Sequence, residues 1–163
     1  MSISFNAAEI FEMAEEIERN AAKFYEEASR NTSDEKTRNM LLEMSKMEWD
    51  HLDIFQQMRK QLTEQEKSTS VFDPQNEAAL YLQTMADGKG CEGKISRTQK
   101  LTGKESIQEV LSIAINAEKN SVAFYSGIKE LVPERAGKDK IDAIIKEELG
   151  HLAVLNLSLA ASK

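Results

Sequence analysis

Apolar residues recur at alternating spacings of four and three over the first part of the chain, which predicts an amphipathic helix over residues 6–30. The repeating positions are Ile10, Ala14, Ile17, Ala21, Phe24 and Ala28. Asn6, followed three residues later by Glu9, is typical of a capped helix start. The cap-forming residues 31–34 then predict a short turn, so the next helix should be an antiparallel neighbour.

A second stripe predicts a helix over residues 34–62, with Thr32 and Glu35 as its expected capping pair. Its positions are Leu41, Met44, Glu48, His51, Phe55, Met58 and Leu62. A glutamate and a histidine therefore take two successive core positions where apolar residues are expected. The methionines at helical spacing, Met40, Met44, Met47 and Met58, are interpreted as core filler.

The second half of the chain repeats this layout. Helices are predicted over residues 106–131, with Ser106 and Glu109 at the start, and over residues 134–160, with Pro133 in the first turn after a break. The core positions of these two helices are Ile107, Val110, Ala114, Ala117, Ser121, Phe124, Ile128, Leu131, Ile141, Ile144, Glu148, His151 and Leu155.

Residues 63–105 are more polar and are predicted to connect the two halves, with a short helix over 76–86. A connection of this length is typical of a crossover along the outside of a bundle. The expected fold is all-α: a single domain over residues 1–163, forming a four-helix bundle. Two helical hairpins, residues 6–62 and 106–160, are joined by the crossover.

The two hairpins are related by an internal repeat with an offset of one hundred positions. The pairs that match are Glu9 and Glu109, Glu18 and Glu118, Asn20 and Asn120, Phe24 and Phe124, Tyr25 and Tyr125, Lys46 and Lys146, Glu48 and Glu148, His51 and His151, and Leu52 and Leu152. The chain has two histidines, and both belong to this repeat as the last residue of a Glu-x-x-His sequence.

The repeat predicts a pair of metal ions. Residues three apart lie on one helix face, so Glu48 with His51, and Glu148 with His151, can each reach one ion. The flanking small and aromatic residues indicate that Glu18 and Glu118 also point inward. Four buried carboxylates without compensating charge would be very costly, and a dinuclear site supplies that charge.

The type of ligand narrows the choice of metal. Four glutamates and two histidines favour iron or manganese over a structural zinc, which prefers thiolate or imidazole in a closed tetrahedron. A single Glu-x-x-His is usually an exposed pair or a satisfied core histidine. Two copies at core positions, with equal spacing to an inward glutamate, are much harder to obtain by chance.

Glu18, Glu48-x-x-His51, Glu118 and Glu148-x-x-His151 on four helices resemble the ferritin-like di-iron carboxylate superfamily, and most closely its rubrerythrin-related branch. The resemblance covers residues 6–160. It implies that Glu48 and Glu148 bridge the metals and that Glu18 and Glu118 are terminal ligands. It also implies that His51 and His151 cap one metal each. Tyr25 and Tyr125 would orient the carboxylates, or would be simple core aromatics.

The chain departs from rubrerythrins in two respects. Its single cysteine, Cys91, cannot build the four-cysteine rubredoxin-like iron domain. Rubrerythrins also have an extra carboxylate one turn before the glutamate of the third helix, where this chain has Ile115. Glu15 takes the equivalent place on the first helix. It is expected to be either a seventh ligand or a solvated surface charge, and we favour the latter.

Composition limits the partners. The net charge of −7 over 163 residues argues against nucleic acid and against an anionic membrane. No apolar segment is long enough to span a bilayer, and no signal peptide is expected at the N-terminus, so the default location is the cytoplasm. The loop around Gly88-Lys89-Gly90, which contains Cys91, lacks the context of a phosphate-binding motif.

The expected function is that of a di-iron oxidoreductase that reacts with dioxygen or hydrogen peroxide and receives electrons from an external carrier. One alternative is iron handling, with ferroxidation coupled to storage or delivery. Another is a bundle whose metal is structural, or is manganese or zinc without a redox role. A homodimer is expected because paired helical hairpins can exchange between protomers, and Trp49 is expected to cover either its own hairpin or a dimer contact.

Overall fold

A computed structural model describes residues 5–68 and 104–162, and this part of the chain is helical with short connections. The first hairpin consists of α1 (Ala7–Asn31) and α2 (Glu35–Lys60), followed by the single-turn helix α3 (Glu64–Lys67). The second consists of α5 (Ile107–Lys129) and α6 (Lys138–Ala161), with the 3₁₀ turn η1 (Glu134–Ala136) between them. The predicted helix over 76–86 lies outside the described residues.

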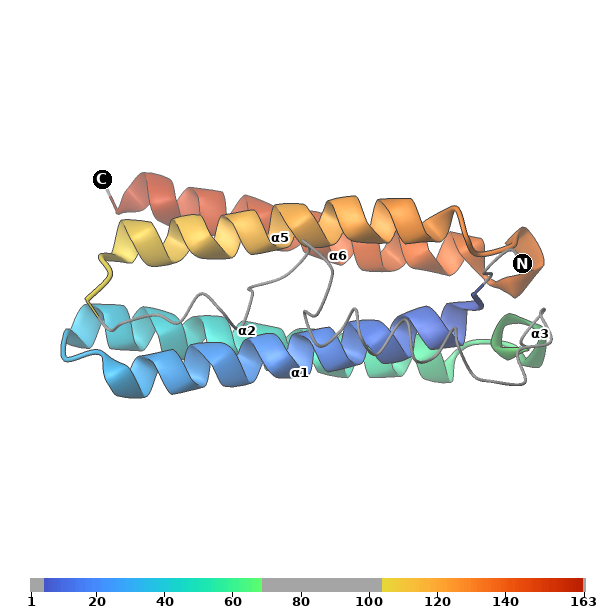
Figure 1. Ribbon diagram of the computed structural model, residues 1–163, viewed down its shortest axis with the longest axis horizontal. Helices are drawn as coiled ribbons and strands as arrows, with labels where there is room; N and C mark the ends of the chain where they lie inside the picture. Colours follow the sequence, from blue (N-terminus) through green and yellow to red (C-terminus); the bar gives the residue numbers. More distant parts are fainter. Residues whose placement is uncertain (1–4, 69–103, 163) are drawn as a thin grey trace.

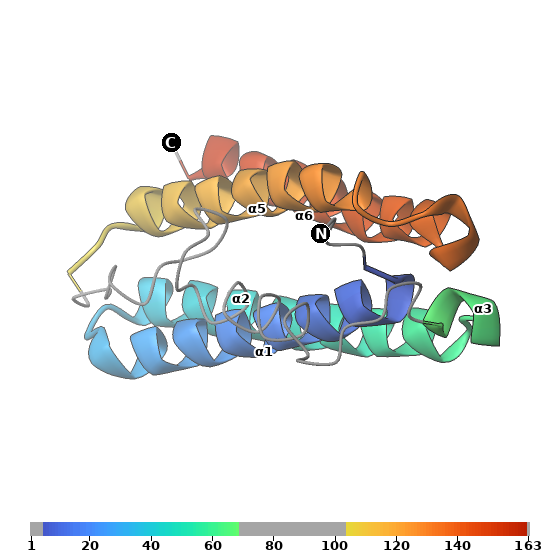
Figure 2. The same cartoon turned by 45° about the vertical axis from the view of Figure 1, so that its right-hand side comes forward.

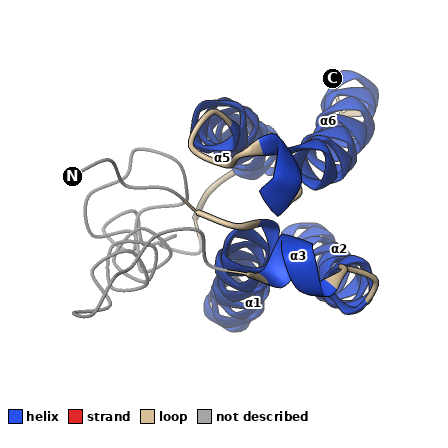
Figure 3. Ribbon diagram, turned by 90° about the vertical axis from the view of Figure 1, so that its right-hand side faces the viewer, coloured by secondary structure: helices blue, strands red, loops and turns tan. Residues whose placement is uncertain are grey.

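The two hairpins form two layers of a four-helix bundle (Figure 1). Within each hairpin the helices are antiparallel, and α2 runs in the same direction as α5. The layers remain distinct in a view turned by 45° (Figure 2). Seen from the end, α1, α2, α5 and α6 occupy four corners (Figure 3). The predicted all-α bundle of two hairpins is confirmed.

The helix starts follow from local capping. Asn6 and Glu9 form a reciprocal capping box, with backbone–side chain distances of 2.9 and 3.0 Å, and Ser106 and Glu109 form its counterpart on α5. The predicted Thr32–Glu35 capping pair is wrong. Asp34 caps α2 by accepting from the Thr37 amide at 2.8 Å. Asp34 directly precedes the first residue of α2, so its carboxylate reaches the free amides of the first turn, whereas Thr32 is the C-cap of α1.

Gly137 sets the start of α6. Its φ of +88° lies in the left-handed region, so the chain leaves η1 and begins α6 one residue later, at Lys138. The predicted continuous helix from residue 134 is therefore wrong at its start. The glycine also packs closely, because a Cβ built there would lie 2.7 Å from the Ala7 Cβ.

We expect Gly137→Ala to lower the free energy of unfolding by about 1–3 kcal/mol, because it combines positive-φ strain with a steric conflict. Urea unfolding followed by circular dichroism measures this. Gly127→Ala is the matched control: it lies within α5 with no atom near the added methyl group, so it should stabilise by up to about 1 kcal/mol. Equal effects of the two substitutions would contradict this account of Gly137.

The apolar core is divided into two clusters, one toward each end of the bundle. The first joins the start of α1 to the ends of α2 and α5, and includes Phe11 and Phe55 in an edge-to-face contact. The second joins the end of α1 to the starts of α2 and α5, and includes Leu41 and Leu111. The middle turns of the four helices lie between the clusters, and these turns carry the predicted ligands.

Some predicted core positions are not in the core. Leu131 is 42% exposed, because α5 ends at Lys129 and the chain turns away there. Phe24 and Phe124 are half-buried, each packed edge-on against the tyrosine that follows it. Of the four methionines interpreted as core filler, Met44 is buried and the others are half-buried. No helix among the described residues is long and apolar enough to cross a membrane.

Candidate metal centre

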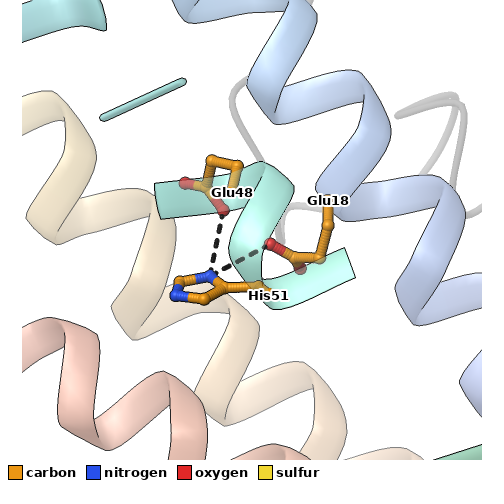
Figure 4. Close-up of side chains that lie close together, drawn as sticks. All are labelled: Glu18, Glu48 and His51. Carbon is orange, nitrogen blue, oxygen red and sulfur yellow. Dashed lines mark ion pairs between the residues drawn. The ribbon is translucent and has the colours of Figure 1, made fainter. Parts of the chain in front are cut away.

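The first group of predicted ligands comes together between α1 and α2. His51 Nδ1 lies 3.4 Å from a carboxylate oxygen of Glu48 and 3.7 Å from one of Glu18 (Figure 4). Glu48 and His51 are one helical turn apart on α2, and Glu18 approaches from the middle of α1. All three side chains are buried. The sequence therefore predicted both the local pair and its partner from the neighbouring helix.

The second group repeats this arrangement between α5 and α6. His151 Nδ1 lies 3.6 Å from a carboxylate oxygen of Glu148 and 3.9 Å from one of Glu118. Again all three side chains are buried. Within each group, one donor atom from every residue lies within 4.8 Å of the other two.

The two groups adjoin across the interface between the hairpins. The imidazole rings of His51 and His151 stack with their centroids 3.2 Å apart and their planes within 6° of parallel. Each ring belongs to a different hairpin, so the stack links the two Glu–Glu–His groups into one centre. Six polar side chains consequently share the middle of the bundle, between the two apolar clusters.

The donor atoms fit cations held within these groups. Nδ1 of His51 and of His151, together with Oε1 of Glu148, are buried and have no hydrogen-bond partner among the described residues. Buried polar atoms normally have a partner, so these three need another explanation. Two ligand atoms that are each about 2.1 Å from one ion lie about 3.0–3.4 Å apart. The nitrogen–oxygen distances of 3.4–3.9 Å are close to this spacing and too long for hydrogen bonds.

The electrostatics of the centre also favour bound cations. Burial raises the pKa of Glu118 well above its ordinary value, and the nearby carboxylates of Glu148, Glu48 and Glu18 raise it further. Within residues 5–68 and 104–162, the basic side chain that lies close to Glu118 and Glu148 is His151. A neutral or singly charged imidazole cannot balance this many carboxylates. Two divalent ions can.

Tyr25 and Tyr125 lie fully buried beside the acidic centre. Burial is the main cause that raises the pKa of each phenol well above its ordinary value, and the glutamates of the centre add to it. Both side chains therefore stay protonated and can donate a hydrogen bond. The Tyr125 hydroxyl has no partner among the described residues, so its donor is free to serve a nearby carboxylate.

Glu15 fits neither sequence interpretation. It is 5% exposed, so it is not a solvated surface charge, and it lies outside both groups of candidate ligands. Its carboxylate instead pairs with Arg59 of α2, with distances of 2.7 and 3.1 Å. Burial raises the pKa of Glu15 and the guanidinium opposes that rise. Sequence analysis did not anticipate Arg59, because its repeat position is Leu159 and it has no motif around it.

Comparison with known proteins agrees with this picture. A family model described as the ferritin-like domain matches residues 6–161. A comparison with curated proteins gave no match. Among solved structures, the chain is similar to a crystal structure from Thermotoga maritima provisionally described as a ferritin-like diiron-carboxylate protein. The two share 23% identity over 98% of each chain, with a TM-score of 0.54.

At that identity the structural likeness supports the fold alone. The family model is stronger evidence, because it spans nearly the whole bundle, including all six candidate ligands. The chain therefore belongs to the ferritin-like domain family.

Proposed function

We propose that this chain is a di-iron carboxylate protein that reacts with dioxygen or hydrogen peroxide and receives electrons from an external carrier. The observation that carries the proposal is the pair of buried Glu–Glu–His groups that meet at the His51–His151 stack. Mixed oxygen and nitrogen donors suit iron or manganese. We take iron, rather than manganese, from the provisional description of the solved neighbour as a diiron-carboxylate protein.

Each ligand has a distinct role in this proposal. As the family resemblance implies, Glu48 and Glu148 would be the bridging carboxylates, each one helical turn from the histidine of its own helix. Glu18 and Glu118 would be terminal ligands, one for each ion. His51 and His151 would each hold one ion through Nδ1, the atom that already faces the carboxylates. The ligand set belongs equally to both hairpins, so neither hairpin alone would form the centre.

When bound, a pair of Fe(II) ions would supply the two electrons that, with two protons, reduce hydrogen peroxide to two waters, and an external carrier would return those electrons. The chain's own residues control the surroundings. Core clusters on both sides exclude water from the centre. With metal bound, the protonated hydroxyls of Tyr25 and Tyr125 would donate to carboxylate oxygens of the ligands and hold them in position as the charge changes.

Anaerobic loading with Fe(II) tests the proposal directly. We expect two iron ions per chain, and a rapid change in near-ultraviolet absorption, marking the oxidation of Fe(II), when hydrogen peroxide or dioxygen is added. The faster oxidant identifies the activity to pursue. The same titration with Mn(II) and Zn(II) compares the metals at equal protein concentration.

Two results would contradict the proposal. Binding of fewer than one iron per chain would remove the dinuclear site. Two bound irons that stay inert to both oxidants would leave the site but remove its redox role, and would favour a structural metal or a different one. Oxidation followed by growth of an iron core in a large assembly would instead point to iron storage.

A further inference from the structure

A pair of glutamates on α1 has the same spacing that brings ligands together elsewhere in the centre. In the two Glu-x-x-His sequences, a carboxylate oxygen lies 3.4 and 3.6 Å from the Nδ1 atom of the histidine three residues later. Glu15 and Glu18 are also three residues apart, and both are buried. Residues at this spacing are neighbours on one helix face. The spacing alone would therefore let Glu15 reach an ion held by Glu18.

Arg59 of α2 holds the Glu15 side chain elsewhere. Its Nε lies 2.7 Å from Oε1 of Glu15, and its Nη2 donates a hydrogen bond to Oε2 at 3.1 Å. Nη1 of the same guanidinium donates to the exposed Glu12, one turn earlier on α1. Arg59 lies eight residues beyond His51 on α2, which is about 12 Å along the helix axis. The ion pair therefore draws the Glu15 carboxylate along the bundle, away from the first ligand group, and Glu15 lies outside that group.

The internal repeat shows that the two members of this ion pair occur together. At the offset of one hundred positions, Glu15 corresponds to Ile115 and Arg59 corresponds to Leu159. The second hairpin therefore has neither the extra carboxylate nor the guanidinium, although it keeps all three of its candidate ligands. A buried carboxylate without a cation is costly. That cost explains why the guanidinium belongs to the hairpin that has the extra carboxylate.

We propose that Arg59 is a positioning residue of the metal centre, which keeps the Glu15 carboxylate out of the coordination of the ion held by Glu18 and His51. The two ions then have equal sets of protein ligands, although the two hairpins differ. A further carboxylate on the first ion would fill a coordination position, and reactive metal sites keep such a position open for the substrate. This inference rests on the metal centre of the proposed function, but it is tested by metal binding and not by turnover.

Glu15 retains the capacity to bind a cation. Its Oε1 atom is buried and accepts no hydrogen bond from the described residues, so the ion pair with Arg59 is what balances it. Arg19, the other basic side chain that acts on this carboxylate, donates to Glu16 instead. Loss of the Arg59 guanidinium would therefore leave a buried carboxylate whose cost a metal ion one turn away could relieve.

Titration of the metal-free full chain with Co(II) tests the proposal, because the visible absorption of Co(II) weakens as its coordination number rises. Arg59→Leu should bind one of its two ions about 10-fold more tightly than the wild type, measured by competition with a chelator. The Co(II) bands of this variant should be weaker. Glu15→Ile/Arg59→Leu gives the first hairpin the apolar pair of the second, and it should return both the affinity and the spectrum to those of the wild type.

Arg19→Leu is the matched control for the loss of a positive charge. Arg19 acts on the Glu15 carboxylate through its charge but is not bonded to it, so this substitution does not release Glu15. The Co(II) spectrum should stay that of the wild type. Bands that weaken equally in Arg19→Leu and Arg59→Leu would assign the effect to charge and would overturn the positioning role.

The second hairpin provides a test that does not depend on the folding of Arg59→Leu. Ile115→Glu places a carboxylate one turn before Glu118, and the residue that corresponds to Arg59 is Leu159, which cannot hold it. The Co(II) bands of Ile115→Glu should therefore be weaker than those of the wild type. Ile115→Glu/Leu159→Arg should restore the wild-type spectrum, and bands that stay weak in this double variant would contradict the proposal.

The outcomes separate this role of Arg59 from the metal centre itself. An Arg59→Leu chain that binds two Co(II) ions with the affinity and spectrum of the wild type would overturn the proposal and leave the centre intact. A Glu15→Ile/Arg59→Leu chain that keeps the weaker bands would show that Glu15 is not the added ligand. A wild-type chain that binds no Co(II) would overturn the metal centre and this role of Arg59 together.

Discussion

His51→Ala is expected to leave one tightly bound iron per chain instead of two and to lower the rate of Fe(II) oxidation by more than about 100-fold. Substitutions beside a metal ligand typically cost 10–100-fold in affinity or activity, so loss of the ligand itself should cost more. Nδ1 of His51 is the nitrogen donor that faces Glu18 and Glu48, and no neighbouring residue among those described replaces it. Iron content and stopped-flow absorption measure the two effects.

The control for His51→Ala is Lys46→Ala, an exposed position on the same helix. It should bind two irons and react at the wild-type rate.

Tyr125→Phe provides an intermediate case, because it keeps the ring but removes the hydroxyl beside the carboxylates. If that hydroxyl orients a ligand, oxidation should slow by about 10–100-fold. Wild-type rates in Tyr125→Phe would show that the tyrosine is a core aromatic, and wild-type rates in His51→Ala would refute the di-iron assignment.

Metal-free protein is expected to lose stability as the pH rises from about 5 to 8, whereas the iron-loaded protein should not. The cause is the carboxylate of Glu118, whose folded-state pKa is raised by burial and by its acidic neighbours. Between the unfolded and folded pKa values the native state binds more protons than the unfolded state. The free energy of unfolding therefore falls as the pH rises through this window.

Bound metal reverses this dependence, because the ligands must be deprotonated to bind and the affinity for the metal therefore rises with pH.

At acid pH, the helix caps change the stability in the direction opposite to the effect of Glu118. Hydrogen bonds from backbone amides lower the pKa values of Asp34 and Glu109. These hydrogen bonds stabilise the fold at pH values above the pKa that each carboxylate has in the unfolded chain. That stabilisation is lost as the pH falls through the lower pKa of the folded state. Metal-free protein should consequently be most stable near pH 5.

Glu118→Gln should raise the stability of the metal-free protein at pH 8 by about 1–3 kcal/mol, the range for relieving a buried polar group without a partner. The substitution should also make the free energy of unfolding of the metal-free protein depend less on pH, and it should weaken iron binding. Glu43→Gln removes the same charge at an exposed position of α2 and should change neither the pH dependence of stability nor iron binding. Urea unfolding at pH 5 and pH 8, after metal removal with a chelator, measures both variants. A metal-free wild type that gains stability toward pH 8 would show that the centre is not strained by its carboxylates.

Much of the fold is readable from the sequence, because it rests on local interactions. The stripe from Ile10 to Ala28 and the cap at Asn6 each depend on residues within a few positions of one another, and helix geometry fixes how such residues relate. The errors fall at junctions. Gly137 takes a left-handed conformation at the junction of η1 and α6, and it lies against Ala7, from the other end of the chain.

The candidate ligands were also predictable, for a related reason. Glu48 and His51 share a helix face by local geometry, and the repeat in the second hairpin shows that this pair occurs at core positions twice. Glu18 could be added because its neighbours on α1 form the buried stripe. The sequence by itself determined the helices, the hairpins and the six residues that converge.

Tertiary structure alone decided how these parts meet. It stacks His51 on His151, pairs Glu15 with Arg59 and leaves the outward face of α6 exposed. Each depends on side chains from segments that are far apart in sequence, and their separation is set by helix packing rather than by spacing along one helix. The sequence fixes which face of a helix a residue occupies, whereas only the packed bundle determines what that face meets.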